Sequence, residues 1–404
     1  TLDVDGGTIK LDGNYPVGSN NVALGNESLN GSISGSENVA VGTYSLDATT
    51  SGSYNSGLGY AALSGNTTGG ANTAIGNGAL ISSTTGSYNT GLGASALLNN
   101  TTASDNTAVG YQAGRSNTTG SPITAIGRKA LYTNTTGADN TALGRNSLFY
   151  NTTGGDNTSS GNEAMQANTT GSYNTAYGSD SLRANTTAAA NTAVGYQALT
   201  TNTTGGDNAA FGYQAAQSNT TGDYLTAIGR QALYNNTTAD NNTAVGYKAA
   251  YSTTTGAYNT AFGYQTLLDN TTGYSNAAFA ADAMGNNTTG FDNTALGNAS
   301  LYTNTTGSYN VALGRAALQN NTTASQNTAV GYRALFTNST GGNNVALGTY
   351  ALDLNTTGAS NTALGYLALS ANTTGTLNVS VGKDSMDSNT TGSSNVALGV
   401  DALQ

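Results

Sequence analysis

A glycine recurs every 17 residues through almost the whole chain, and this fixed period constrains the fold more than any other feature. The glycine stands at residues 25, 42, 59 and so on to 399, which gives 23 copies without an insertion or deletion, and Ala280 replaces it in one copy. The copies share the pattern N-T-A-φ-G-x-x-A-L-x-x-N-T-T-G-x-x, where φ is mostly Val, Leu, Ile or Phe. Positions 1 to 17 below refer to this pattern. A short fixed period indicates supersecondary units that stack on their neighbours.

Each copy is too short for two helices with their turns, and the frequent glycine and threonine residues are poor helix formers. We therefore predict an all-β fold, a parallel β-solenoid (β-roll) of 23 coils in which short strands are joined by tight corners. Coils stacked about 4.8 Å apart would span roughly 110 Å. Residues 1–20 lie outside the repeat and are expected to cap the solenoid or join it to a preceding module. The repeat covers 21–404 and stops in mid-coil, so we expect a continuation.

The composition excludes several classes of partner and chemistry. With 11 Lys and Arg against 21 Asp and Glu, the net charge of −10 disfavours nucleic acid and anionic lipid as partners. The chain has no cysteine and no histidine, so disulfides, Cys–His or His-based Ser catalysis, and thiolate or imidazole metal sites are excluded. No apolar run approaches the ~18 residues of a membrane helix. We expect no cofactor and no membrane insertion in this segment.

Strand geometry predicts which columns of side chains face the interior, because neighbouring residues of a strand point to opposite faces. Small alanines at positions 3 and 8 suit a narrow interior, so the large apolar residues at positions 4 and 9 are expected to point outward. The position-4 column includes Leu296, Leu313, Val330, Leu347 and Leu364, and the position-9 column includes Leu301, Leu318, Leu335, Leu352 and Leu369. Such stripes are too large to leave in water, so we expect burial between chains around a symmetry axis, in a homo-oligomer such as an intertwined or side-by-side homotrimer. The alternative is a wider single-chain core filled by the Leu columns, with the Ala residues outside.

Two asparagine columns mark the corners. Position 1 is Asn in 21 of 23 copies, and position 12 begins N-T-T or N-S-T in 18 of 22 complete copies. Asn accepts corner geometry, and identical Asn side chains on stacked coils can form hydrogen-bonded ladders. We predict such structural ladders at Asn293, Asn310 and Asn327 and at Asn287, Asn304 and Asn321. The N-T-T triplet also matches an N-glycosylation acceptor, but bulky glycans on successive coils would crowd one another, which favours the ladder.

The stretch "NTAVGYQALTTNTTG" at 191–205 and its copies resemble the repeats of bacterial and phage tail-fibre-domain proteins. The core N-T-A-φ-G-x-x-A is also similar to the head repeat of trimeric autotransporter adhesins, which form a left-handed parallel β-roll as a homotrimer. The resemblance covers roughly 21–404, although the adhesin repeat is shorter than 17 residues. It implies an extracellular fibre or adhesin shaft on a bacterial surface or virion, which provides reach and attachment to a host or prey surface or its glycans.

Two other functions remain as alternatives. A trimeric tailspike that binds or cuts polysaccharide would need a carboxylate pair, for which the irregular coils at Pro122-Ile123, Ser159-Ser160 and Ala280 are candidates. An ice-binding solenoid would need flat threonine columns, and position 2 offers one. Because the 23 copies contain no insertion that could form a cleft, we expect that the segment is not an enzyme.

One aromatic column is the candidate for ligand contact. Position 6 carries Tyr196, Tyr213, Arg230, Tyr247 and Tyr264 on five successive coils. Tyrosine rings beside an arginine can stack on sugars or cations, which makes the column a candidate glycan contact. The same rings could instead cover the edge of the solenoid and pack on each other.

Overall fold

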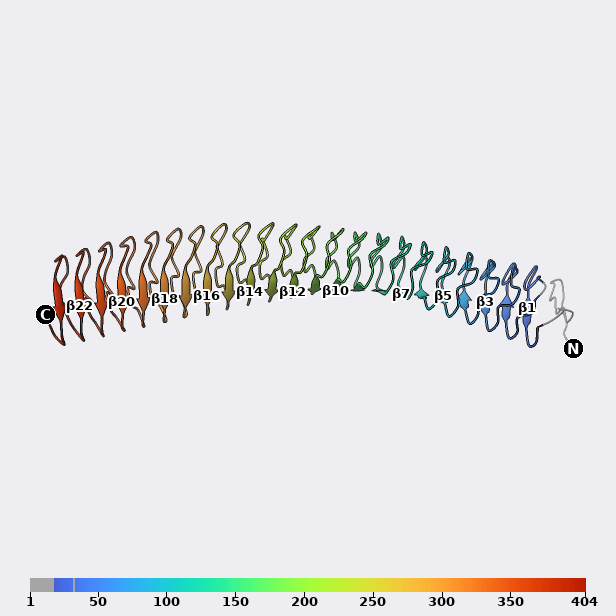
Figure 1. The fold of residues 1–404 in the computed structure, drawn as a ribbon, viewed down its shortest axis with the longest axis horizontal. Coiled ribbons are helices and arrows are strands. Elements are labelled where there is room, and N and C mark those ends of the chain that lie inside the picture. The colour runs from blue at the N-terminus through green and yellow to red at the C-terminus, as the bar shows by residue number, and fades with distance from the viewer. Residues whose placement is uncertain (1–17, 32) are drawn as a thin grey trace, which may run out of the picture. The chain divides into compact units, whose positions relative to one another are not determined.

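The computed structural model describes residues 18–31 and 33–404, so most of the expected N-terminal cap (1–20) lies outside the described residues. It confirms an all-β parallel solenoid with one short strand in each coil and no helix among the described residues. The chain forms two compact units that divide between Thr204 and Gly205. Within each unit, consecutive strands lie side by side, as Figure 1 shows.

The first unit holds eleven strands, and within it neighbouring strands pair in parallel at an offset of 17 residues. They are β1 (Val22–Leu24), β2 (Val39–Val41), β3 (Ser56–Leu58), β4 (Thr73–Ile75), β5 (Thr90–Leu92), β6 (Thr107–Val109), β7 (Ile123–Ile126), β8 (Asn140–Leu143), β9 (Thr158–Ser160), β10 (Thr175–Tyr177) and β11 (Thr192–Val194).

The second unit holds twelve strands with the same parallel register. They are β12 (Ala209–Phe211), β13 (Thr226–Ile228), β14 (Thr243–Val245), β15 (Thr260–Phe262), β16 (Ala277–Phe279), β17 (Thr294–Leu296), β18 (Val311–Leu313), β19 (Thr328–Val330), β20 (Val345–Leu347), β21 (Thr362–Leu364), β22 (Val379–Val381) and β23 (Val396–Leu398).

Two tight turns follow each strand and close the coil. In the coil that begins at Asn293, the Ser300 amide donates to the Gly297 carbonyl at 3.1 Å and the Asn304 amide donates to the Leu301 carbonyl at 3.4 Å. Non-glycine residues at positions 7, 9 and 17 adopt left-handed backbone angles in nearly every coil, as Leu301 does with φ of 53°. The backbone between these turns bonds to the next coil, so the stacking of coils satisfies most of its polar groups.

The outward orientation predicted for the position-9 leucines is wrong. Leu301, Leu318, Leu335, Leu352 and Leu369 are fully buried, each with 0% exposure. Alternation applies only to an extended strand, and position 9 lies in a turn with a left-handed backbone that directs its side chain inward. The core is therefore formed mainly by small residues at positions 3 and 8, mostly Ala, together with position 9, mostly Leu.

The outward orientation predicted for position 4 is confirmed. Leu296 is 52% exposed, Leu347 is 42% exposed and Leu364 is 41% exposed, while Leu313 and Val330 are half-buried. These residues lie at the third place of a three-residue strand whose central alanine is buried. The strand alternates as an ordinary half-buried strand does.

Glycine at position 5 is required by two independent constraints. Its φ lies between 127° and 148° in the glycine-containing copies, a region that L-residues rarely adopt. A Cβ on Gly331 would also lie 2.7 Å from the carbonyl carbon and oxygen of Gly348 in the next coil. Ala280 is the natural exception, and its φ is reduced to 95°.

We expect Ala280→Gly to raise the free energy of unfolding by about 1 kcal/mol. The substitution relieves a left-handed alanine, which costs about 1–3 kcal/mol, and this gain exceeds the about 0.4–1 kcal/mol that glycine adds to the entropy of the unfolded chain. Urea unfolding of the two proteins measures the difference. A lower unfolding midpoint for the variant would contradict the interpretation that Ala280 is strained.

Candidate interaction surfaces

The position-1 asparagines form a buried hydrogen-bonded ladder. Both the backbone amide and Nδ2 of Asn310 donate to Oδ1 of Asn293, at 2.9 and 3.1 Å, and the Asn327 amide donates to Oδ1 of Asn310 at 3.0 Å. The exposure of Asn293, Asn310 and Asn327 is at most 1%. The ladder satisfies backbone donors at the start of each strand, where the strand pairing has not yet begun.

The position-12 asparagines form a second buried ladder on the other side of the corner. Nδ2 of Asn304 donates to Oδ1 of Asn287, and Nδ2 of Asn321 donates to Oδ1 of Asn304, both at 2.7 Å. The two ladders meet, because Nδ2 of Asn293 and Nδ2 of Asn304 both donate to the Gly307 carbonyl at 2.9 Å. The shared acceptor joins the beginning of a coil to its end.

This geometry argues against N-glycosylation of the folded chain. Nδ2 of Asn304 is the atom that a glycan would occupy, yet it is buried and donates two hydrogen bonds. A glycan there would break both ladders at the corner.

Where isoleucine replaces Asn at position 1, the backbone adjusts. The Ile123 amide still donates to Oδ1 of Asn106 at 2.9 Å, but Ile123 has no side-chain oxygen for the next coil. β7 and β8 are each four residues long, and Ile123 pairs directly with Asn140. The strand pairing is thus one residue longer at the coil where the side-chain ladder is interrupted.

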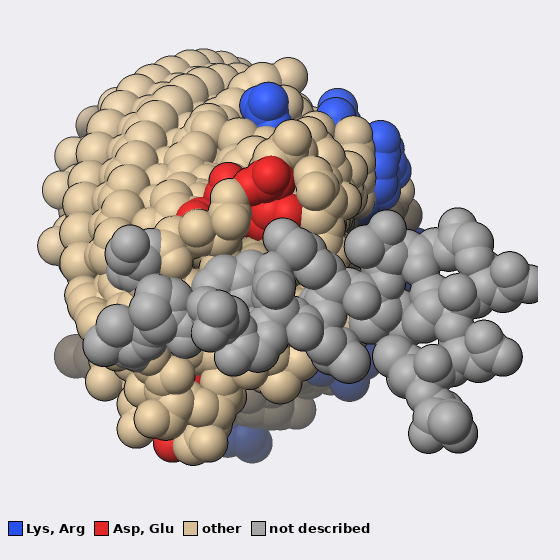
Figure 2. Space-filling model, turned by 90° about the vertical axis from the view of Figure 1, so that its right-hand side faces the viewer, with Lys and Arg blue, Asp and Glu red and all other residues tan. Residues whose placement is uncertain are grey.

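The outward face of the strands is uncharged in both units, with mostly threonine or valine at position 2 and a large apolar residue at position 4 in nearly every coil. No copy carries a charged residue at position 2 or position 4. In the first unit Leu58, Leu92 and Ile126 are 40–47% exposed, and in the second Phe211, Ile228 and Phe262 are 40–52% exposed. Figure 2 shows mostly tan atoms on this side of the described residues, with one group of acidic residues near the centre and basic residues toward the right. We call positions 2 and 4 the strand face.

The predicted aromatic column at position 6 is divided between the two units. Tyr196 belongs to the first unit and is 44% exposed, and Tyr213, Arg230, Tyr247 and Tyr264 belong to the second. Cζ of Arg230 lies 5.4 Å from the centre of the Tyr213 ring, and Tyr247 stacks on Tyr264 with 5.4 Å between ring centres. Tyr213 and Tyr264 are still 44% and 52% exposed, so the column packs on itself and leaves ring surface accessible.

A second set of aromatic stacks, at position 10, was not predicted from the sequence. Tyr132 stacks on Phe149 with 4.9 Å between ring centres, and Nζ of Lys129 lies 5.3 Å from the Tyr132 ring. Tyr234 and Tyr251 stack in the same way at 5.0 Å, and Nζ of Lys248 lies 5.0 Å from the Tyr251 ring. The sequence signal was aromatic residues 17 apart with a basic residue three places earlier in the coil. Both lysines therefore make cation–π contacts with these rings.

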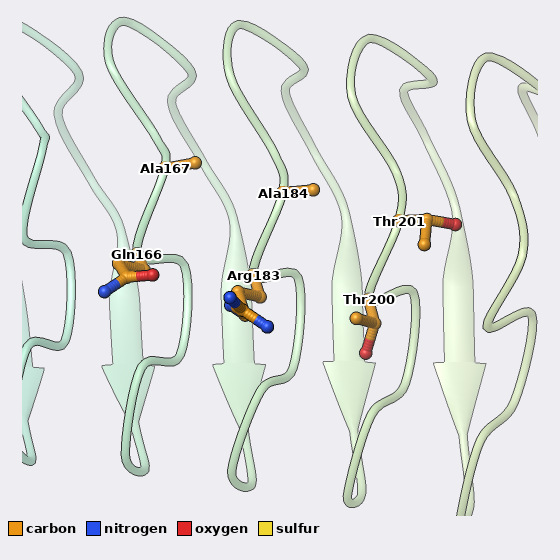
Figure 3. Close-up of a pocket in the computed structure, with 6 residues that line it drawn as sticks. All are labelled: Gln166, Ala167, Arg183, Ala184, Thr200 and Thr201. Carbon is orange, nitrogen blue, oxygen red and sulfur yellow. The ribbon is translucent and has the colours of Figure 1, made fainter.

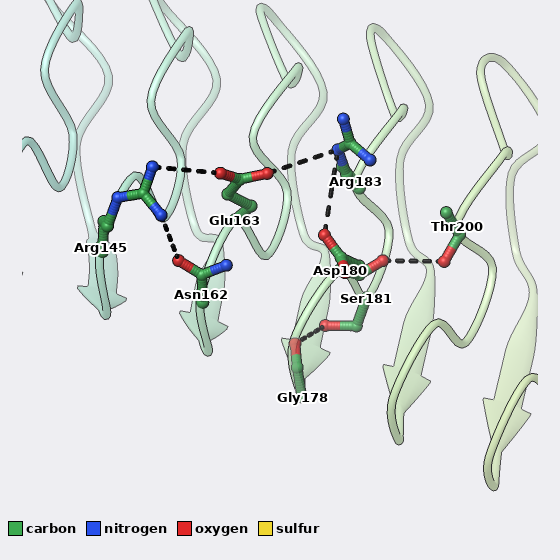
Figure 4. A network of polar contacts seen from close by, with 8 residues as sticks. All are labelled: Arg145, Asn162, Glu163, Gly178, Asp180, Ser181, Arg183 and Thr200. Carbon is green, nitrogen blue, oxygen red and sulfur yellow. Dashed lines mark hydrogen bonds and ion pairs between the residues drawn. The ribbon is translucent and has the colours of Figure 1, made fainter.

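A shallow hollow of about 300 Å³ lies at positions 10 and 11 of three coils in the first unit (Figure 3). Its lining consists of Gln166, Ala167, Arg183, Ala184, Thr200 and Thr201. Beside it, Glu163 lies between Arg145 and Arg183, at 3.6 and 3.7 Å, and Asp180 lies 3.9 Å from Arg183 (Figure 4). Two cations and two carboxylates balance, so the network links neighbouring coils without creating a strongly charged site.

The irregular coils do not interrupt the stacking. Ser159 is buried at position 3, where its hydroxyl donates to the Ala164 carbonyl at 3.0 Å, and β9 keeps its register with β8 and β10. Two carboxylates do lie near each other in the first coils, namely Glu27 and Asp47. Burial raises the pKa of Asp47 above its usual value, and the charge of Glu27 raises it further. Among the described residues, no group of three or more His, Cys, Asp or Glu is placed to hold a metal ion.

Comparison with known proteins identifies no relative: no family model matches the chain, and no curated protein matches its sequence. Within the described part of the chain, no helix has the length and apolar character needed to cross a membrane.

Proposed function

We propose that the chain is a structural segment of an extracellular, homo-oligomeric fibre, a shaft of the adhesin or tail-fibre kind on a bacterial surface or virion. The observation that carries this proposal is the strand face, which presents exposed apolar residues and no charge in coil after coil. A repeated and uniform surface suits a spacer that gives reach, because it offers few places for a unique site.

The size of the strand face supports association of identical chains. From position 2 to position 4 the face is about 7 Å wide, and each coil adds about 4.8 Å. Summed over the coils of both units, the strand face therefore amounts to roughly 750 Å², close to the ~800 Å² that each partner contributes to a standard interface. A second copy offers the same face with the same coil spacing, so the two could align over many coils. The resemblance to trimeric adhesin repeats favours three copies.

A polysaccharide-binding surface is the second candidate, and the exposed rings at position 6 favour it. Tyr213 and Tyr264 leave about half of their surface accessible beside Arg230 and Tyr247. Such a column fits attachment to a surface glycan. Loss of glycan-array binding in Tyr213→Ala with Tyr264→Ala, at unchanged assembly mass, would support it.

Charge placed on the strand face tests the fibre proposal. We expect the double variant Leu296→Lys with Leu347→Lys to dissociate the assembly and leave each chain folded, because both side chains already point outward. Size-exclusion chromatography with light scattering measures the mass, and circular dichroism reports the fold. The matched control places the same two charges at exposed position 17, as Gln326→Lys with Ser360→Lys, and should keep the native mass. An unchanged mass for the strand-face variant would contradict the proposal.

A further inference from the structure

Threonine at position 14 is uniform although the fold makes no visible use of its hydroxyl group. It occurs in 20 successive coils, from Thr68 to Thr391 at steps of 17. All 20 side chains are exposed. None of these hydroxyl groups has a hydrogen-bond partner among the described residues. We call these residues the outer threonine column.

The threonine next to it has a clear structural role. At position 13 the Thr305 hydroxyl donates to the Thr322 carbonyl of the next coil at 3.0 Å, and Thr288 donates to Thr305 at 2.9 Å. Exposed positions without such a role vary within the chain: position 17 is Tyr, Asp, Glu, Ala, Asn, Ser, Gln, Leu or Pro in different coils. The uniformity of the outer threonine column therefore points to a requirement outside the fold.

The N-glycosylation acceptor pattern does not explain the column. In two coils position 12 is Ser83 or Thr253, so no acceptor asparagine is present, and position 14 is still Thr85 or Thr255. Where the asparagine is present, it is buried in its ladder.

Binding of a flat crystalline lattice does not explain it either. A lattice would need uniform columns on both sides of the threonines, but position 16 ranges from Gly and Ser to Asp, Tyr and Phe. A covalent modification needs only one accessible acceptor in each coil and tolerates this variation.

We propose that the outer threonine column is an array of acceptors for single O-linked sugars. The hydroxyls are accessible, and they are followed by Gly or Ala at position 15 and mostly by Ser, Gly or Ala at position 16, which leaves room for an attached ring. Six-membered rings on successive coils fit this spacing, since Tyr234 and Tyr251 stack with 5.0 Å between centres. Branched glycans would not fit.

Neutral sugars suit the column better than phosphate groups do. Each phosphate would add about −1.5 to −2 charges, and the groups would stand about 4.8 Å apart on a chain whose net charge is already −10. Only 8% of the residues are charged, so a row of sugars would hydrate an otherwise weakly polar surface without such repulsion.

The chemistry requires a nucleotide-activated sugar and a glycosyltransferase that acts on the chain. The threonine Oγ1 forms a bond to the anomeric carbon of the sugar, and the bond from that carbon to the diphosphate oxygen breaks. The nucleoside diphosphate leaves with the electron pair, and the hydroxyl proton passes to a base of the transferase. The reaction is a group transfer without oxidation or reduction.

Mass spectrometry of proteolytic peptides from residues 21–404 of the protein purified from its natural source tests the proposal, with electron-transfer fragmentation to locate each group. We expect peptides that are heavier than their sequence by whole numbers of one sugar unit, with the sugars on position-14 threonines. Peptides with the mass of their sequence, increments of phosphate, or sugars confined to asparagine or to other positions would overturn it.

Paired isosteric variants produced in the same source separate modification from structure. The triple variant Thr289→Val, Thr306→Val and Thr323→Val should lose three sugars and keep its unfolding midpoint. The matched triple at position 13, Thr288→Val, Thr305→Val and Thr322→Val, should keep those three sugars and unfold at a lower temperature, because its hydroxyls donate to the next coil. A position-14 variant that keeps its full sugar content would overturn the proposal, and neither result bears on oligomerisation of the strand face.

Discussion

Gly331→Ala is expected to lower the free energy of unfolding by about 3 kcal/mol. Gly331 has φ of 131°, and a Cβ there would lie 2.7 Å from the backbone carbonyl of Gly348. Backbone strain of this kind costs about 1–3 kcal/mol, and overpacking adds about 1–3 kcal/mol. Partial relaxation of the kind seen at Ala280, where φ falls to 95°, limits the total. Urea unfolding followed by circular dichroism measures the change.

Gly342→Ala in the same coil is the matched control. A Cβ at Gly342 meets only the Ser325 carbonyl oxygen, at 3.1 Å, and four other coils already carry alanine at this position, at 138, 189, 257 and 359. We expect a change within about 0.5 kcal/mol, as for most surface substitutions. If the two substitutions lowered the free energy of unfolding equally, the backbone conformation at position 5 would not be what requires glycine there.

The second large effect is expected from Asn310→Asp, a change that keeps the shape of the side chain. The new oxygen would face Oδ1 of Asn293 and the Ala324 carbonyl, to which Nδ2 of Asn310 donates at 3.1 and 2.9 Å. Each buried group left without a partner costs about 1–3 kcal/mol, and more when it is charged. We expect the free energy of unfolding to fall by about 4 kcal/mol at neutral pH.

Two further measurements separate the loss of hydrogen bonds from the buried charge. A buried carboxyl group favours its neutral form, so the loss in Asn310→Asp should shrink as the pH is lowered. Asn310→Leu copies the natural residue at position 1 of another coil, Leu225, and should destabilise less. If Asn310→Asp were as stable as the native chain at neutral pH, the ladder would not hold the corner together.

The sequence predicted the architecture because the period sets the coil and the residue types exclude helices. It did not predict the inward orientation of Leu301 and its equivalents, because strand alternation was applied to a turn. A left-handed backbone at position 9 leaves no clear signal when the residue is a leucine, which rarely adopts that conformation outside such a fold.

The surfaces were only partly predictable. The Tyr213–Arg230 contact lies in a column that the sequence marked, whereas the Tyr132–Phe149 stack required comparison of residues 17 apart at a variable position. The number of chains that associate was not predictable from the residue pattern, because it depends on how copies of the strand face fit each other.

The mass of the native assembly in solution tests the proposed homo-oligomer most directly. Light scattering or native mass spectrometry of the unmutated chain should give about three times its 40.3 kDa at micromolar concentration. The exposed apolar residues of the strand face would then be buried between chains. A stable monomer of 40.3 kDa under the same conditions would contradict the account.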